Sequence, residues 1–315
     1  MNRLYPRCAL ATVVAAASFQ LVSGALQPAP KPAKALPRPF NLAALNTKFD
    51  EDDPFVSRDG TRLLYTSNSS KHFTLMASQQ RNRLQFFPSS EKWPAGEELE
   101  GQNAEGDNRS PFLTPDNHDL YYAEKIAVKA PAGEAQAPAN YDIAHAIKLV
   151  KPTQFTGPTY VQSVCTAEDE LHPWLTDDGL ELYFSRKTRD GWRVFVARRA
   201  PATKKEPKGA FGEPVLVEDF PAGFHHATLA RDRRVVYLQG PLDKNRWGLF
   251  RAKRQSVKDP WGKPQPLEGL DHPEAPTGDT SPCLSREGSK LYFSSDRPGG
   301  KGGRDLWVVE LRWFD

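Results

Sequence analysis

The chain has 315 residues, of which 38% are hydrophobic, so it can form one large domain or two ordinary ones around a substantial core. Its 28 Pro and 22 Gly favour many turns and argue against long helices. The 42 Lys and Arg nearly balance the 39 Asp and Glu, and this net charge of +3 gives no reason to expect a nucleic-acid partner.

The first 25 residues have the features of a secretory signal peptide. The segment MNRLYPR carries two Arg and no acid, and the apolar stretch CALATVVAAASFQLV and small residues at Ser23 and Ala25 follow it. A buried helix or a membrane anchor is the alternative, but the stretch is short for a span of about 20 residues. We predict a signal peptide at 1–25, a Pro-rich spacer at 26–35, no membrane span in the mature chain, and a periplasmic or secreted location.

Five segments of the chain align without gaps. They are DPFVSRDGTRLLYTS from Asp53, SPFLTPDNHDLYYAE from Ser110, HPWLTDDGLELYFSR from His172, HATLARDRRVVYLQG from His226 and SPCLSREGSKLYFSS from Ser281. Their second residues are spaced by 57, 62, 54 and 55 positions. Self-similarity at a nearly constant period is the signature of a repeat architecture.

Two columns of this alignment predict a hairpin turn after the first strand. The seventh position holds an acid that can accept hydrogen bonds from its own turn: Asp59, Asp116, Asp178, Asp232 and Glu287. The eighth position suits a left-handed backbone in four segments, with Gly60, Asn117, Gly179 and Gly288. The fourth segment has Arg233 there, so we expect its turn to be distorted.

Three further strands follow in most repeats. The second strand has apolar residues at successive positions, as in Leu63-Leu64-Tyr65, so both of its faces are apolar. This is typical of a strand buried on both faces. The third is predicted at 72–78, 141–147, 192–198, 247–253 and 305–311. The fourth begins with a bulky residue and a Pro, as at Trp93-Pro94, and Pro is tolerated on an edge strand. Four strands per repeat is typical of a propeller blade.

The fifth repeat has no fourth strand of its own before Asp315. The missing strand is found near the other end, where LPRPFNLAALN at 36–46 matches WGKPQPLEGLD at 261–271. We therefore predict an all-β fold at residues 36–315, a five-bladed β-propeller with four antiparallel strands per blade. Its N-terminal strand closes the last blade by pairing with residues 305–311.

The repeat resembles the WD40-like β-propeller repeat of the TolB type. The resemblance rests on SPCLSREGSKLYFSSDRPGGKGGRDLWVVEL in the fifth unit and DEDDPFVSRDG in the first. It implies an extracytoplasmic propeller used for protein contacts, and some propellers with similar repeats are peptidase-associated domains or sugar-acid lyases. The chain departs from the pattern at Ala227, at Arg233 and in the insertion KAPAGEAQAPAN at 129–140.

The loops before the first strands carry the candidate site, because propellers bind ligands at the channel mouth or on loops over one face. These loops are acidic in four units and contain two His in the remaining one. The candidate ligand-binding residues are Asp53, Asp107, Glu170, His172, His225, His226 and Asp279. We expect closure to gather them, in register, near one opening, where they could hold a cation such as calcium or a basic partner group. The competing interpretation is that they bond turn backbones and neighbouring blades.

Cysteine usage excludes a disulfide-built scaffold. Cys8 lies in the proposed signal peptide, which leaves Cys165 and Cys283, and no Cys-x-x-Cys pair is present. The two remaining residues fall in different predicted blades, whereas bridged Cys need Cα atoms within about 7 Å. We expect no disulfide.

Two functions from different classes remain open. The favoured one is a monomeric binding scaffold without a cofactor, which recognises a protein or a glycan in the cell envelope. The other is a carbohydrate-active hydrolase or lyase that uses carboxylates with His172 or His226 at the channel mouth. No Gly-x-Ser-x-Gly, His-Glu-x-x-His or phosphate-binding Gly loop supports catalysis, and no catalytic residue is assigned. A deep polar pocket would favour the enzyme, and a channel filled by side chains would favour the scaffold.

Overall fold

The structure is a computed structural model that describes residues 38–70, 72–80, 93–103, 106–125, 139–204, 208–243 and 245–314. The proposed signal peptide and spacer lie outside the described residues, and so does nearly all of the insertion at 129–140. Within the described ranges, no helix is long and apolar enough to cross a membrane.

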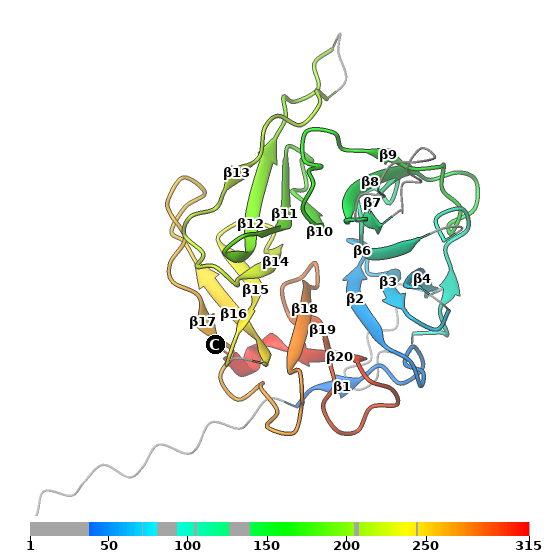
Figure 1. Ribbon diagram of the computed structural model, residues 1–315, viewed down its shortest axis with the longest axis vertical. Helices are drawn as coiled ribbons and strands as arrows, with labels where there is room; N and C mark the ends of the chain where they lie inside the picture. Colours follow the sequence, from blue (N-terminus) through cyan, green and yellow to red (C-terminus); the bar gives the residue numbers. More distant parts are fainter. Residues whose placement is uncertain are drawn as a thin grey trace, which may run out of the picture. The chain divides into compact units, whose positions relative to one another are not determined.

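The described residues form five antiparallel sheets of four strands each, arranged in a ring around a central axis (Figure 1). Blade 1 consists of β2 (Glu51–Val56), β3 (Arg62–Ser67), β4 (Thr74–Gln79) and β5 (Glu97–Glu98). Blade 2 consists of β6 (Asp107–Leu113), β7 (Asp119–Lys125), β8 (Asp142–Ile147) and β9 (Thr159–Tyr160). Blade 3 consists of β10 (Glu170–Leu175), β11 (Glu181–Thr188), β12 (Gly191–Arg198) and β13 (Val215–Leu216).

The last two blades complete the circle. Blade 4 consists of β14 (His225–Leu229), β15 (Val235–Pro241), β16 (Trp247–Lys253) and β17 (Gln265–Pro266). Blade 5 consists of β18 (Asp279–Leu284), β19 (Lys290–Ser295), β20 (Asp305–Glu310) and β1 (Phe40–Asn41), and a short 3₁₀ helix, η1 (Leu311–Phe314), follows β20. The first strands contact one another in the order β2, β6, β10, β14 and β18, and β18 contacts β2. The five-bladed propeller expected from the repeats is confirmed.

The N-terminal strand closes the last blade, as predicted. Strand β1 runs antiparallel to β20, with Phe40 opposite Val308 and Asn41 opposite Trp307. Just after the strand, the Asn46 side chain donates to the Leu306 carbonyl at 3.0 Å and accepts the Leu306 N–H at 2.8 Å. The closure therefore depends on both a short ladder and a buried side-chain amide.

Each first strand contains a β-bulge at the same column of the repeat. The bulged residue is left-handed in all five blades, with φ between 51° and 57°: Asp53, Ser110, His172, His226 and Ser281. This conformation is uncommon outside Gly, and a bulge re-aims the side chain of its strand. The bulge therefore explains why these five side chains, one from each blade, meet near the channel axis.

The hairpin turns after the first strands are regular, including the one expected to be distorted. Arg233 adopts a left-handed φ of 57°, and its N–H bonds the Ala230 carbonyl at 2.8 Å, as the Gly60 N–H bonds that of Ser57. The Arg233 guanidinium also donates to Glu181 of the preceding blade at 3.1 Å. The expected distortion is wrong, because this contact between blades holds a non-Gly residue in the turn.

The outer strands are shorter than the sequence suggested. Each has two residues and begins after the Pro that was expected to lie within it; Pro94, for example, precedes β5. Short edge strands limit edge-to-edge pairing with other chains. Both cysteines that the structure describes, Cys165 and Cys283, are free thiols and pack in different core clusters.

Candidate functional site

Three layers of side chains line the channel, and every blade contributes one residue to each layer. The polar layer consists of the bulged residues Asp53, Ser110, His172, His226 and Ser281. The plug, two positions further along each first strand, consists of Phe55, Phe112, Trp174, Thr228 and Cys283. The basic mouth, at the other end of these strands, consists of Arg58, Pro115, Asp177, Arg231 and Arg286.

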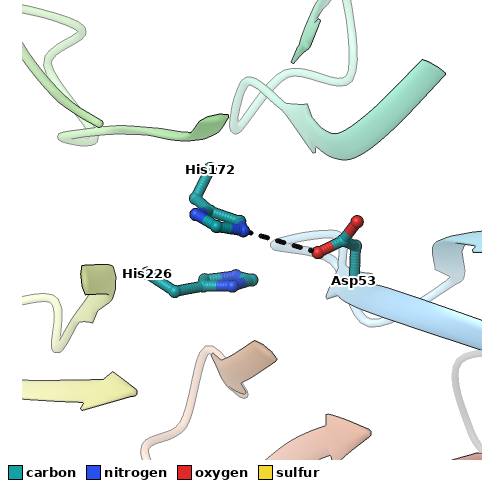
Figure 2. A group of neighbouring side chains, drawn as sticks. All are labelled: Asp53, His172 and His226. Carbon is teal, nitrogen blue, oxygen red and sulfur yellow. Dashed lines mark ion pairs between the residues drawn. The ribbon is translucent and has the colours of Figure 1, made fainter. Parts of the chain in front are cut away.

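Three residues of the polar layer form a compact cluster (Figure 2). One ligand atom each from Asp53, His172 and His226 lies within 4.8 Å of the other two. The His172 Nε2 atom is 3.7 Å from Asp53 Oδ1, and the two imidazoles stack with centroids 3.8 Å apart. The adjoining cavity of about 20 Å³ has room for one water or one ion. The structure therefore brings three of the seven candidates together: Asp53, His172 and His226.

One fully buried nitrogen of this cluster has no hydrogen-bond partner. His172 Nδ1 lies 3.0 Å from Ser185 Oγ, and the same oxygen accepts the His226 backbone N–H at 2.9 Å. His226 Nδ1, by contrast, is buried and unpaired. A buried polar atom without a partner is costly, and a metal ion bound to this Nδ1 would remove that cost.

The imidazoles of the cluster are uncharged near neutral pH. Burial, together with the neighbouring His226 and His225, holds the pKa of His172 well below its usual value. Burial and the neighbouring His225 lower the pKa of His226 to about 3. Metal ligation requires neutral imidazole, so neither side chain has to lose a proton before it binds an ion at pH 7.

Two adjacent carboxylates, Asp53 of the cluster and its neighbour Asp52, have pKa values shifted in opposite directions. Burial opposes the ionisation of Asp52, but Arg304, at 3.0 Å, and Arg109, at 3.8 Å, outweigh it and hold the Asp52 pKa well below its usual range. Burial and the charge on Asp52 raise the pKa of Asp53 to about 6. The Ser281 hydroxyl lies 2.7 Å from Asp52 and 3.3 Å from Asp53.

His225 lies beside this cluster and belongs to an aromatic group. Its ring stacks on Trp192, with centroids 5.3 Å apart and an interplanar angle of 18°, and it meets Trp247 edge-on at 5.0 Å. Both Trp side chains are half-buried. His225 Nδ1 lies 2.8 Å from the Gly223 carbonyl, so this nitrogen carries the proton and Nε2 has the lone pair. Burial lowers the pKa of His225 to about 4.

The structure does not bring the remaining three candidates to the cluster. Asp107 accepts the Phe73 N–H at 2.9 Å, Glu170 pairs with Arg186 at 2.7 Å, and Asp279 pairs with Arg297 at 2.6 Å. The expectation that they share a register with Asp53 is wrong. They lie two or three positions before the bulge, where the chain enters the blade, and their carboxylates bond a backbone N–H of the preceding blade or an Arg of the same blade.

The candidate set from the sequence left out four polar residues around the cluster: Asp52, which belongs to the acidic loop of the first unit, and Arg109, Ser281 and Arg304. Ser281 could have been found, because it occupies the same alignment column as Asp53. Arg304 could not, because it precedes β20 in blade 5 and reaches a carboxylate of blade 1 across the closure.

No family model and no curated protein sequence matches the chain. Its fold is similar to that of the α-L-arabinofuranosidase PaAbf62A from Podospora anserina in complex with cellotriose (10% identity, 89% of this chain and 97% of that chain, TM-score 0.56). A GH62 hydrolase in complex with xylotriose gives 10% identity, 87% and 97% coverage and a TM-score of 0.57. TolB from Acinetobacter baumannii is 14% identical, with 82% of this chain and 53% of that chain covered and a TM-score of 0.42. At 10% identity, the similarity to the arabinofuranosidase and to the GH62 hydrolase shows the fold alone.

Proposed function

We propose that this β-propeller is an extracytoplasmic glycan-binding scaffold with TolB-type repeats, and that its polar layer holds one divalent metal ion. The observation that carries the glycan proposal is the aromatic group of Trp192, His225 and Trp247 beside the Asp53–His172–His226 cluster. Sugar rings present C–H bonds on their faces, and indole faces provide a matching apolar surface with a polar N–H at the edge. Of the two partner classes expected from the sequence, this surface favours a glycan over a protein.

The donor set of the cluster favours a transition metal over the calcium expected from the sequence. Calcium takes oxygen ligands, whereas two imidazoles and one carboxylate suit Zn²⁺, Fe²⁺ and related ions. Bonds of about 2.1 Å to one ion place two ligand atoms at most about 4.2 Å apart, and the three ligand atoms here lie within 4.8 Å of one another. To bind one ion, the two imidazoles, which are stacked at 21°, would have to turn so that one nitrogen of each points at it.

Substitution His226→Ala is expected to abolish metal binding. It removes one of the two imidazoles of the cluster, and because loss of even an outer partner of a metal ligand costs 10- to 100-fold, we expect affinity to fall by about 100-fold or more. The measurement is bound Zn²⁺ by elemental analysis after dialysis, together with the shift in melting temperature on adding Zn²⁺. His118, exposed in the turn between β6 and β7, provides the control variant His118→Ala. Equal Zn²⁺ retention in wild type, His226→Ala and His118→Ala would contradict the proposal.

Substitutions Trp192→Ala and Trp247→Ala are each expected to weaken oligosaccharide binding by about tenfold, since an aromatic contact contributes about 0.5–1.5 kcal/mol beyond its buried area. The measurement is titration calorimetry against a panel of neutral and acidic oligosaccharides. Phe40→Ala, at an exposed aromatic residue on the outer edge strand β1, is the matched control. The glycan proposal fails if no oligosaccharide of the panel binds wild type, or if Phe40→Ala weakens binding as much as the Trp variants.

A glycoside hydrolase is the second candidate, and one observation favours it. Asp52 and Asp53 have pKa values pushed apart, as in acid–base pairs of enzymes. Each is only 3% exposed, however, and both approach the same Ser281 hydroxyl, which leaves no room for a glycosidic bond between them. The same oligosaccharides, incubated with the protein and analysed for products, separate the two functions. Products that disappear with Asp53→Asn would support the hydrolase, and intact sugars support the scaffold.

A further inference from the structure

The basic mouth is separated from the polar layer by the plug. The cavities on the two sides share the side chains of Phe55, Phe112 and Trp174 as a common wall. These rings are in contact, with Phe55 and Phe112 centroids 4.8 Å apart and Phe112 and Trp174 centroids 6.2 Å apart. A ligand at the basic mouth would therefore not reach the Asp53–His172–His226 cluster.

Three arginines converge on the basic mouth, and one carboxylate lies close to two of them. Arg58, Arg231 and Arg286 come from blades 1, 4 and 5, and Asp177 is the one acid among the described residues that line the cavity. Asp177 pairs with Arg58 and lies 3.7 Å from Arg231. The described contact of Arg286 at this mouth is to the Arg58 carbonyl at 3.5 Å. Three cations and one anion leave two positive charges uncompensated among these groups.

This excess of charge acts on a side chain that has little access to water. The Arg58 side chain is 17% exposed. Burial, and then the positive charges of Arg231 and Arg286, hold the Arg58 pKa below its ordinary value. Like charges brought together in a partly buried site are unfavourable unless an anion offsets them. The mouth is therefore suited to bind an anion.

The inner part of the cavity, away from the arginines, is lined by apolar side chains. Phe55, Phe112 and Trp174 form its inner wall, and Leu113, Leu175, Leu229 and Leu284 line its sides. Its volume is about 70 Å³, about half of the 150 Å³ cavity that accommodates benzene. A short branched aliphatic group fits this space, whereas an inorganic anion would leave it unfilled.

We propose that the basic mouth is a binding site for a small organic carboxylate. Its apolar end enters the cavity against Phe55, Phe112 and Trp174, and its carboxylate accepts hydrogen bonds from Arg231 and Arg286 beside the Arg58–Asp177 pair. A guanidinium presents two parallel donors to a carboxylate, which makes this pairing both strong and directional. A free short-chain acid and the C-terminal residue of a polypeptide share this chemistry. The site is independent of the proposed glycan-binding surface.

Titration calorimetry with matched acid and amide probes tests the site. Isovalerate represents a free short-chain acid, and N-acetyl-leucine represents the C-terminal residue of a polypeptide. The comparison compounds are the two matching amides, isovaleramide and N-acetyl-leucinamide, and inorganic phosphate. We expect at least one acid to bind, and to bind about tenfold or more tightly than its amide, because charge-assisted hydrogen bonds are lost in the amide. The acid that binds more tightly identifies the source. The proposal would be overturned if each acid bound no more tightly than its amide. It would also be overturned if inorganic phosphate bound as tightly as both acids.

Charge variants give a second, independent readout. Because Arg231 and Arg286 are exposed, Arg231→Gln with Arg286→Gln should leave the fold intact and weaken acid binding by about tenfold or more. Asp177→Asn removes the competing carboxylate and should strengthen it severalfold. The control is Arg189→Gln, at an exposed Arg in the turn between β11 and β12, which should change nothing. Weaker binding by Asp177→Asn, or equal loss in the Arg189 control, would contradict the proposed site.

Discussion

Deletion of residues 36–45 is expected to unfold the propeller near ambient temperature. The deletion removes β1 and the buried side chains of Leu42 and Leu45, which are 2% and 1% exposed and pack against Leu306 and Val308. Truncating a buried Leu costs about 2–5 kcal/mol, so the loss of two approaches the total stability of about 5–15 kcal/mol of a typical domain. The measurement is thermal denaturation followed by circular dichroism. A truncated chain that melts at the wild-type temperature would disprove the closure argument.

The matched control is a shorter deletion. Removing residues 1–35 takes away only the proposed signal peptide and spacer and leaves the described part of the propeller whole. We expect the melting temperature to stay unchanged, so the effect of the longer deletion would belong to the closing strand. Asn46→Ala should give an intermediate loss of about 1–3 kcal/mol, since it leaves the backbone groups of Leu306 without their side-chain partners.

This closure could be predicted from the sequence because the repeat itself revealed it. The match between 36–46 and 261–271 identified the missing strand, and β1 pairs with β20 at the expected place. The length of the outer strands could not be predicted. A Pro shows where an edge strand begins, but it does not show how many residues of that strand form hydrogen bonds with the neighbouring strand. The regular turn at Arg233 was missed for a different reason, since its stabilising partner Glu181 lies in another blade.

Of the candidate residues, only those at the bulged position of the repeat alignment meet in the cluster. Asp53, His172 and His226 share that column, and the bulge points one residue of each blade at the channel. Asp107 and Glu170 are equally acidic in sequence, but they lie before the bulge and stabilise loops. Residue type indicated which side chains can bind an ion, whereas the backbone conformation decided which of them meet.

Substituting the adjacent carboxylates Asp52 and Asp53 by Asn is expected to change stability in opposite directions. Asp52 is ionised and paired with Arg304 and Arg109, and removal of one partner of a buried ion pair costs about 3–5 kcal/mol. Its folded pKa lies below the unfolded value, so its contribution is fully present above pH 4 and is lost as the pH falls through the folded pKa. Asp52→Asn should therefore destabilise the protein at pH 7, and less at low pH.

Asp53→Asn should instead stabilise the metal-free protein above pH 6 while abolishing metal binding. Its folded pKa, raised from 3.8 to about 6, means that the folded state holds a proton that the unfolded state has lost, so wild-type stability falls as the pH rises between these values. Asn avoids the buried charge, and two pH units correspond to about 2–3 kcal/mol. Urea denaturation in EDTA at pH 4, 6 and 8 measures both variants. If Asp53→Asn destabilises the metal-free protein at pH 8 as much as Asp52→Asn does, the carboxylate of Asp53 is structural. If it stabilises the fold and prevents Zn²⁺ binding, Asp53 carries a charge that the fold alone disfavours and that a bound cation offsets.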